Sequence, residues 1–211
     1  MSAAADITIV DYGVGNLGSL RNAIAKVGHA AEISGDPATI AAAHRLILPG
    51  VGAFDRAVAQ LAARGLGEAV VEAARERGVP LAGVCLGMQL LMDGSDEGVL
   101  PGLGLIPGRV RRFPDAIDGR RLLVPHMGWS TVSAAKPSRL APSLTDGGRF
   151  YFVHSYAVEP DRAEDVLTWT EYGIRFASTI ERDNVLGIQF HPEKSHRFGL
   201  AILREFAEAG S

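Results

Sequence analysis

The single cysteine of the chain lies in the segment whose residue types and spacing most clearly suggest a catalytic role. Residues 83–89, GVCLGMQ, lead from an apolar run into a helical pattern. A glycine-flanked turn between a strand and a helix presents a nucleophile, and the positive end of the helix dipole favours the thiolate. The Leu86 N–H is then an oxyanion donor, and Gln89 lies one turn along the face of Cys85. The segment predicts a nucleophilic thiol; the alternative is a buried core cysteine on a tight turn.

A histidine with a nearby carboxylate follows a second apolar run. Residues 187–193 read GIQFHPE, so a predicted strand ends just before His191. Pro192 biases His191 to an extended backbone, in which His191 and Glu193 project to the same side. A carboxylate beside an imidazole fixes its tautomer and stabilises its charged form. We interpret His191 as the base for Cys85 and Glu193 as the group that orients it. The alternative is a surface histidine beside an unrelated glutamate.

Two other histidines are also candidate site residues. His126 and His154 are both expected to end strands. Of the other three, His29 and His44 have surface-like contexts, and His196 has no predicted strand before it. Only His191 both follows a predicted strand and has a carboxylate two positions later in the chain. Periodicity alone does not show that His191 meets Cys85 in space.

A glycine-rich turn near the N-terminus offers a different function. Residues 13–18, GVGNLG, follow a predicted strand and open a predicted helix, and Glu32 lies at about the distance of a ribose-binding acid. This is the context of a dinucleotide-binding turn. Any strand-to-helix turn also favours glycine, and Asn16 would cap the helix. The pattern therefore leaves two interpretations open.

The first half of the chain alternates between strand and helix patterns. Strands are predicted over residues 7–11, 30–33, 45–48 and 79–84, and helices over 16–27, 54–77 (with a break near 65–67) and 86–92. Such alternation predicts parallel strands with helical crossovers on both faces of a sheet.

The second half carries closely spaced strand patterns instead. They cover residues 104–113, 121–124, 149–153, 165–170, 174–181 and 185–190, before a closing helix over 198–207. These patterns suggest antiparallel hairpins added to the parallel sheet. We predict one α/β domain over residues 1–211 with a mixed sheet. The alternative is a division near residue 100.

Composition excludes several classes of function. The 211 residues are 47% hydrophobic and 21% charged, as in ordinary globular proteins. A net charge of −3 and 7% aromatic residues argue against binding to nucleic acid or anionic lipid. One cysteine excludes a disulfide framework and a multi-cysteine metal site. Residues 1–6 lack the basic residues of a signal peptide, and the longest uncharged apolar run, 79–92, is too short to span a bilayer. We expect a cytoplasmic protein.

At these motifs the chain resembles the class I, or triad, glutamine amidotransferases, whose signature is Gly-x-Cys-x-Gly-x-Gln followed by a later His-x-Glu. Several strings are similar to those of one branch, the glutaminase subunits of imidazole glycerol phosphate synthase. They are residues 11–16, 49–54, 83–91, 125–129, 151–156 and 189–195. Met88 also points to this branch, because members that serve other synthases tend to carry histidine there.

The resemblance implies a flavodoxin-like fold and a set of site residues, with no cofactor and no metal. It implies a triad of Cys85, His191 and Glu193. It implies an oxyanion site at Val51, Gly52 and Leu86. Glutamine would be held by Gln89, Glu97, His154, Ser155 and Tyr156, and a partner subunit would be met by Asn16, Trp129 and Lys194.

The resemblance also implies an activity and a partner. Glutamine would be hydrolysed through a cysteine thioester, and the ammonia would pass within a heterodimer to a (β/α)8-barrel cyclase subunit. The cyclase would make imidazole glycerol phosphate and aminoimidazole carboxamide ribonucleotide in histidine biosynthesis. The alternatives are a glutaminase for another synthase, such as the pyridoxal phosphate one, a dinucleotide-binding module, and a non-catalytic interaction subunit.

Overall fold

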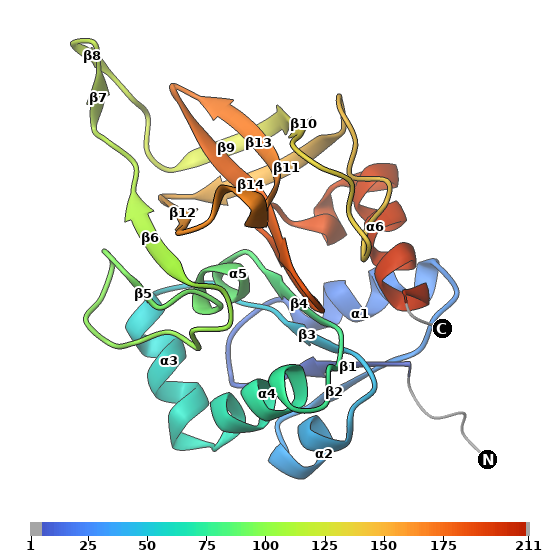
Figure 1. Cartoon of the computed structure of the whole chain (residues 1–211). Helices are drawn as coiled ribbons and strands as arrows, with labels where there is room; N and C mark the ends of the chain where they lie inside the picture. The colour runs from blue at the N-terminus through green and yellow to red at the C-terminus, as the bar shows by residue number, and fades with distance from the viewer. Residues whose placement is uncertain (1–5, 210–211) are drawn as a thin grey trace.

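One mixed sheet of eleven strands organises the computed structural model, which describes residues 6–209 (Figure 1). Five neighbouring strands are parallel, in the order β2-β1-β3-β4-β15. They are β1 (Ile7–Val10), β2 (Ala31–Ser34), β3 (Leu46–Leu48), β4 (Leu81–Val84) and β15 (Val185–Ile188). The first four come from the first half of the chain, and the fifth comes from its end.

Helices cover both faces of the parallel strands (Figure 1). One face carries α1 (Leu17–Lys26) and α6 (His196–Glu208), and the other carries α2 (Pro37–Ala42), α3 (Phe54–Ala63) and α4 (Leu66–Arg75). Each face has its own apolar cluster, because strand side chains alternate between the two faces. The predicted break in the helical pattern is confirmed, since Gly65 adopts a φ of 64° between α3 and α4.

The antiparallel part of the sheet is built around β14 (Ile174–Arg182), which pairs with β15 and with two other strands. The other members are β5 (Gly94–Ser95), β6 (Gly108–Arg112), β10 (Ser133–Ala134), β12 (Tyr156–Pro160) and β13 (Val166–Tyr172). Two strand pairs lie outside this sheet: β7 (Ala116–Ile117) with β8 (Arg120–Arg121), and β9 (His126–Thr131) with β11 (Arg149–His154). The predicted mixed α/β sheet is confirmed.

Several predicted segments need correction. Strand β15 is not only part of an antiparallel hairpin, because it also pairs in parallel with β4 at the centre of the sheet. Residues 122–124 lie outside any strand, and His126 begins β9 rather than ending a strand. The predicted strand over 104–113 is confined to β6. The elements that were not predicted include α2, β9 and β12 and the short strands β5, β7 and β10.

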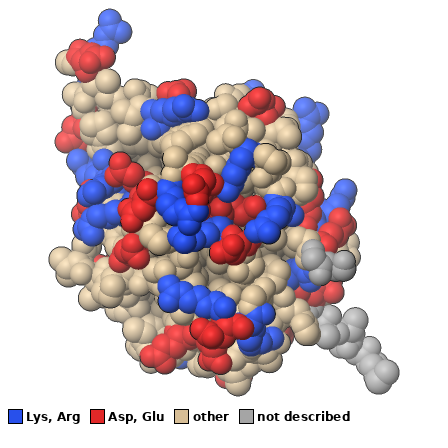
Figure 2. Space-filling model, viewed as in Figure 1, with Lys and Arg blue, Asp and Glu red and all other residues tan. Residues whose placement is uncertain are grey.

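The outer surface mixes charges of both signs. On the face shown in Figure 2, lysine and arginine side chains alternate with aspartate and glutamate, without a large area of one sign. None of the described helices combines the length and the apolar character needed to cross a membrane.

The remaining short helices are α5 (Leu86–Leu90), η1 (Ala163–Asp165) and η2 (Pro192–Lys194).

Candidate active site

The register of two parallel strands brings the predicted nucleophile and base together. Val84 in β4 pairs with Ile188 in β15, so both strands end at the same edge of the sheet. The Cys85 N–H donates to the Ile188 carbonyl at 2.7 Å, directly after the last paired residues. Segments from the middle and the end of the chain therefore leave the sheet side by side. Ligand sites in α/β sheets form at this carboxyl edge.

Cys85 has the backbone of a strained elbow. Its φ of 55° and ψ of −111° are unusual for a residue with a side chain. A Cβ atom at Gly83 would lie 2.7 Å from the Gly87 carbonyl oxygen, and one at Gly87 would lie 1.8 Å from the Leu48 oxygen. Both glycines are therefore needed because backbones pack against each other at the turn.

His191 is held in one orientation by its neighbours. Its Nδ1 lies 3.0 Å from the Glu193 Oε1, and both side chains are buried. Because the carboxylate accepts, Nδ1 carries the proton. The backbone of His191 is fixed as well: its N–H donates to the Tyr151 carbonyl at 2.9 Å, and its carbonyl accepts from the Ser195 hydroxyl at 2.6 Å.

The local backbone at Glu193 differs from the prediction. His191 is extended, with a φ of −94° and a ψ of 100°, but Glu193 lies in the short helix η2. The extended geometry predicted to place both side chains on one side is therefore wrong beyond His191. The turn of η2 achieves the contact instead, because it folds the Glu193 side chain back onto the ring.

The second nitrogen of His191 is available to the sulfur. Nε2 is buried, and no described residue forms a hydrogen bond of normal length and angle with it. Burial lowers the pKa of His191, but the interactions of the ring with Cys85 and Glu193 outweigh burial and raise that pKa to about 9. An imidazolium placed between a sulfur and a carboxylate is the charge state that stabilises a thiolate.

A cavity of about 340 Å³ opens at this edge of the sheet. Cys85 and His191 line it, although Cys85 is only 7% exposed. All the residues predicted for the oxyanion site and for glutamine binding line the same cavity: Val51, Gly52, Leu86, Gln89, Glu97, His154, Ser155 and Tyr156. The cysteine is therefore at the wall of a cavity rather than enclosed in packed hydrocarbon. The size suits a small polar ligand.

Gln189 was missed by the sequence analysis. Its side chain is fully buried, and its Nε2 approaches the Cys85 sulfur at 3.9 Å. Gln89 donates from Nε2 to the Gln189 Oε1 and to the Tyr156 carbonyl, both at 3.3 Å. Gln189 stands two residues before His191 at the end of the predicted strand 185–190, so alternation along that strand was the available signal. In the structure β15 ends one residue before Gln189.

Tyr12 is a second buried residue without a predicted role. Its hydroxyl donates to the Pro49 carbonyl at 2.6 Å, just before the predicted oxyanion residues Val51 and Gly52. Burial raises the pKa of Tyr12, and the charge of Cys85 adds to the effect. The hydroxyl therefore keeps its proton and anchors the start of this segment.

A chain of hydrogen bonds runs from β9 into the cavity wall. The Tyr156 carbonyl only accepts, so His154 Nδ1 donates to it at 2.8 Å. In a neutral ring His154 Nε2 then accepts from His126 Nδ1 at 3.1 Å, and His126 Nε2 accepts from the Ser130 hydroxyl at 2.9 Å. This order fixes the tautomer of both rings and orients the carbonyl that Gln89 contacts.

The two rings predict a loss of stability in mild acid. Burial lowers the pKa of His126 to about 4 and that of His154 to about 3, from an ordinary value of 6.5. Above pH 6.5 the rings are neutral in both states of the chain. As pH falls below 6.5, the two histidines are protonated in the unfolded chain but stay neutral in the folded chain. The free energy of unfolding therefore decreases. Each unit of lowered pKa contributes about 1.4 kcal/mol.

Urea unfolding between pH 7 and pH 4 measures this effect. His126→Asn keeps a donor toward His154 but removes one titrating ring, so it should destabilise the protein at pH 7 and lose less stability on acidification. The difference between the parent protein and the variant should shrink as pH falls. A difference that stays constant with pH would contradict the assigned protonation.

The residues predicted to face a partner lie at two places. Asn16 and Lys194 are exposed at the rim of a cavity of about 40 Å³ that His191 and Glu193 also line. Trp129 lies on β9, is 40% exposed, and stacks on His196 with ring centres 5.2 Å apart.

The cavity that borders the glycine-rich turn at Asn16 is too small for a dinucleotide. The cavity beside Asn16 holds only about 40 Å³, well below the roughly 300 Å³ of small ligand sites. Asn16 caps α1 by accepting from the Ser19 N–H, and Glu32 accepts from the Thr8 hydroxyl at 2.9 Å. Asn16 therefore serves the start of α1, and Glu32 links the neighbouring strands β1 and β2.

Comparisons with known proteins agree with this geometry. The family model described as "Glutamine amidotransferase class-I" matches residues 8–209. A Moorella thermoacetica protein named imidazole glycerol phosphate synthase subunit HisH is 50% identical over 203 residues, covering 96% of this chain and 94% of the relative. The Gloeobacter violaceus protein of the same name is 47% identical, covering 99% of this chain and 91% of the relative.

Solved structures show the same fold at low identity. The structure titled PurLQS from Thermotoga maritima aligns with a TM-score of 0.72 and 17% identity, covering 96% of this chain and 97% of that one. The Trypanosoma brucei CTPS glutaminase domain with bound acivicin aligns with a TM-score of 0.66 and 18% identity, covering 97% and 94%. This chain belongs to the class-I glutamine amidotransferase family and, within it, to the group of imidazole glycerol phosphate synthase HisH subunits.

Proposed function

We propose that residues 1–211 form one glutaminase domain that hydrolyses glutamine at Cys85. The observation that carries the proposal is the shared end of β4 and β15, where Cys85 and His191 line one cavity and Glu193 orients the ring. A lone free cysteine in such a site is stable as a thiol in the cytoplasm, where we place the reaction.

The first half of the reaction forms a thioester. The Cys85 sulfur attacks the side-chain amide carbon of glutamine, forming the C–S bond and moving an electron pair onto the oxygen. N–H groups of Leu86 and of the Val51–Gly52 peptide hold this oxyanion. The C–N bond then breaks, and His191 gives its proton to the departing nitrogen, which leaves as ammonia.

The second half releases glutamate. His191, now neutral at Nε2, takes a proton from water, and the resulting hydroxide attacks the thioester carbon. The C–S bond breaks, the electron pair returns to sulfur, and the imidazolium is restored beside the thiolate. The Nδ1 proton stays on His191 throughout, and the Glu193 carboxylate accepts its hydrogen bond.

The remaining cavity residues hold the amino-acid end of glutamine. Glu97 supplies the negative charge for the ammonium group, and Gln89 lies one helical turn beyond the nucleophile. The segment 154–156 also lines the cavity, and His154 and Gln89 both donate to the Tyr156 carbonyl.

A partner must receive the ammonia. Ammonia that enters water is mostly protonated and stops being a nucleophile, so the product needs a sheltered second active site. The names of the relatives point to that partner, since each is a subunit of imidazole glycerol phosphate synthase. We propose a heterodimer with the (β/α)8-barrel cyclase subunit, met by Asn16, Trp129 and Lys194, that produces imidazole glycerol phosphate and aminoimidazole carboxamide ribonucleotide for histidine biosynthesis.

A coupled assay tests the proposal. The chain is mixed with the cyclase subunit and its ribonucleotide substrate, and with the synthase subunit of pyridoxal phosphate synthesis as a comparison. We expect glutamine to support imidazole glycerol phosphate formation and no pyridoxal phosphate formation. Glutamine-dependent product only with the second synthase would overturn the choice of partner, and no glutamine hydrolysis with either would overturn the proposed activity.

A further inference from the structure

The loop that carries Glu97 is fastened to the first turn of α3. Glu97 accepts from the Phe54 N–H through Oε2 at 3.0 Å, which satisfies a free N–H at the start of the helix. In return, the Asp55 carboxylate accepts from the Val99 and Leu100 N–H groups, both at 3.0 Å. Three hydrogen bonds therefore join loop and helix, and Asp55 makes two of them.

Gly98 permits this close approach. A Cβ atom at position 98 would lie 1.9 Å from the Asp55 Oδ1 and 2.3 Å from its Cγ. Only glycine lets the carboxylate lie flat against the loop backbone. The contact is thus built from both sides, by an acidic residue on α3 and a glycine on the loop.

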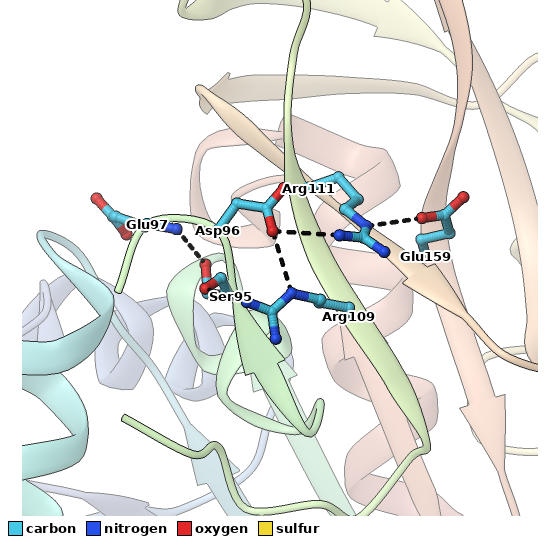
Figure 3. A network of polar contacts seen from close by, with 6 residues as sticks. All are labelled: Ser95, Asp96, Glu97, Arg109, Arg111 and Glu159. Carbon is cyan, nitrogen blue, oxygen red and sulfur yellow. Dashed lines mark hydrogen bonds and ion pairs between the residues drawn. The ribbon is translucent and has the colours of Figure 1, made fainter. Parts of the chain in front are cut away.

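The opposite end of the loop has a separate anchor, seen in Figure 3. The Asp96 Oδ1 accepts from Arg109 at 3.1 Å and from Arg111 at 3.3 Å, and Arg111 also donates to Glu159 at 3.0 Å. The Glu97 N–H donates to the Ser95 hydroxyl at 3.0 Å. This network ties the residues before Glu97 to β6 and β12, whereas the residues after Glu97 depend on Asp55.

The two anchors both involve exposed groups, so the kind of contact that each makes decides between them. Arg109, Arg111 and Glu159 have side chains about half exposed or more, at 48%, 53% and 69%. Exposed ion pairs contribute little. The Asp55 carboxylate instead accepts two backbone N–H groups at a helix N-terminus, where a negative charge is favoured. Asp55 is therefore the contact on which the position of the Glu97 carboxylate depends most.

We propose that Asp55 is a positioning residue for glutamine: it holds loop 97–100 so that the Glu97 carboxylate meets the α-ammonium group of the substrate. Asp55 is not among the residues that line the cavity, so it would act on glutamine through Glu97. The inference rests on the proposed function, because it assigns Glu97 to the ammonium.

The experiment compares Asp55→Asn with the parent protein in complex with the cyclase subunit. Asparagine is nearly the same size but has one accepting oxygen, so one loop N–H loses its partner. We expect the KM for glutamine to rise roughly tenfold, with kcat changed less than about threefold. Ammonium-dependent synthesis should be unchanged, which shows that the complex is intact.

A substrate analogue separates positioning from general disorder. The des-amino analogue 4-carbamoylbutanoate has the amide and the carboxylate but no ammonium. Its inhibition constant should be the same with Asp55→Asn and with the parent protein. In a Glu97→Gln background, Asp55→Asn should add less than about twofold to the KM for glutamine, because the group that Asp55 positions has already lost its charge.

Two further variants complete the design. Gly98→Ala disturbs the same contact from the loop and should give the same selective rise in the KM for glutamine. It tests the contact independently if Asp55→Asn folds poorly. Glu68→Gln removes an exposed first-turn carboxylate from α4 and should leave all constants unchanged.

The outcomes separate this inference from the proposed function. Unchanged KM in both Asp55→Asn and Gly98→Ala would overturn the role of Asp55, as would an equal weakening of glutamine and the des-amino analogue, or full additivity with Glu97→Gln. A parent complex that does not hydrolyse glutamine would overturn the proposed function and this inference together.

Discussion

Replacing Cys85 with alanine should abolish glutamine hydrolysis, with a fall in kcat of about 10⁴-fold or more. The reason is that the thioester route is lost, and water at this site has no comparable way to attack an amide. The measurement is glutamate release by the complex with the cyclase subunit at saturating glutamine.

Ammonium salts provide the control for Cys85→Ala. The variant shortens one side chain at the wall of a cavity, so the fold and the partner surface should persist. Synthesis from free ammonium should therefore continue at the parent rate. Glutamine turnover within tenfold of the parent rate would show that Cys85 is not the nucleophile.

Replacing His191 with asparagine should lower kcat by roughly 10²- to 10⁴-fold, because the leaving nitrogen and the attacking water both lose their proton carrier. Glutamate release measured as for Cys85→Ala gives the loss. A rate close to that of the parent protein would rule out His191 as the acid–base group.

Glu193→Gln offers a milder matched variant with a distinct pH signature. The pKa of His191 is raised to about 9 by its interactions with Cys85 and Glu193, against the effect of burial. Acylation needs the imidazolium proton, so kcat/KM in the parent protein should fall as pH rises through about 9. With the carboxylate charge removed, the His191 pKa drops and this alkaline decline moves to lower pH. An unmoved decline would contradict the assigned role of Glu193.

Local sequence signals were sufficient to predict the strand-to-helix elbow at Cys85. The elbow at Cys85 is encoded within seven residues, since Gly83 and Gly87 are needed for backbone contacts that no larger residue allows. The same holds for α1, α3, α4 and the parallel strands of the first half, whose apolar periodicity reflects burial on two faces. Short-range patterns of this kind predict the structure correctly because the local backbone and the tertiary contacts favour the same conformation.

The meeting of Cys85 and His191 could not be predicted from pattern alone. It depends on β15 inserting beside β4, a pairing between segments far apart in the chain. Strand periodicity reports which face is buried but not which neighbour a strand chooses. The resemblance to a known family supplied that step, and the structure shows its physical basis in the Val84–Ile188 register.

The missed elements had weak signals. Strand β9 reads HMGWST, in which only His126 is buried and the alternate positions, Gly128 and Ser130, are half-buried. Its His126 is buried through hydrogen bonds with His154 and Ser130 rather than through apolar character. Gln189 is likewise buried by a polar network. Hydrophobic periodicity does not detect polar groups that are buried because they are paired.

Covalent labelling tests the central claim most directly, because the chain has only one cysteine. The complex is treated with a chloroketone analogue of glutamine, and the labelled peptide is identified by mass spectrometry, with and without competing glutamine. We predict one adduct, on Cys85, that glutamine suppresses and that forms much more slowly in His191→Asn. Labelling that ignores glutamine, or an equal rate in His191→Asn, would contradict a Cys85–His191 active site.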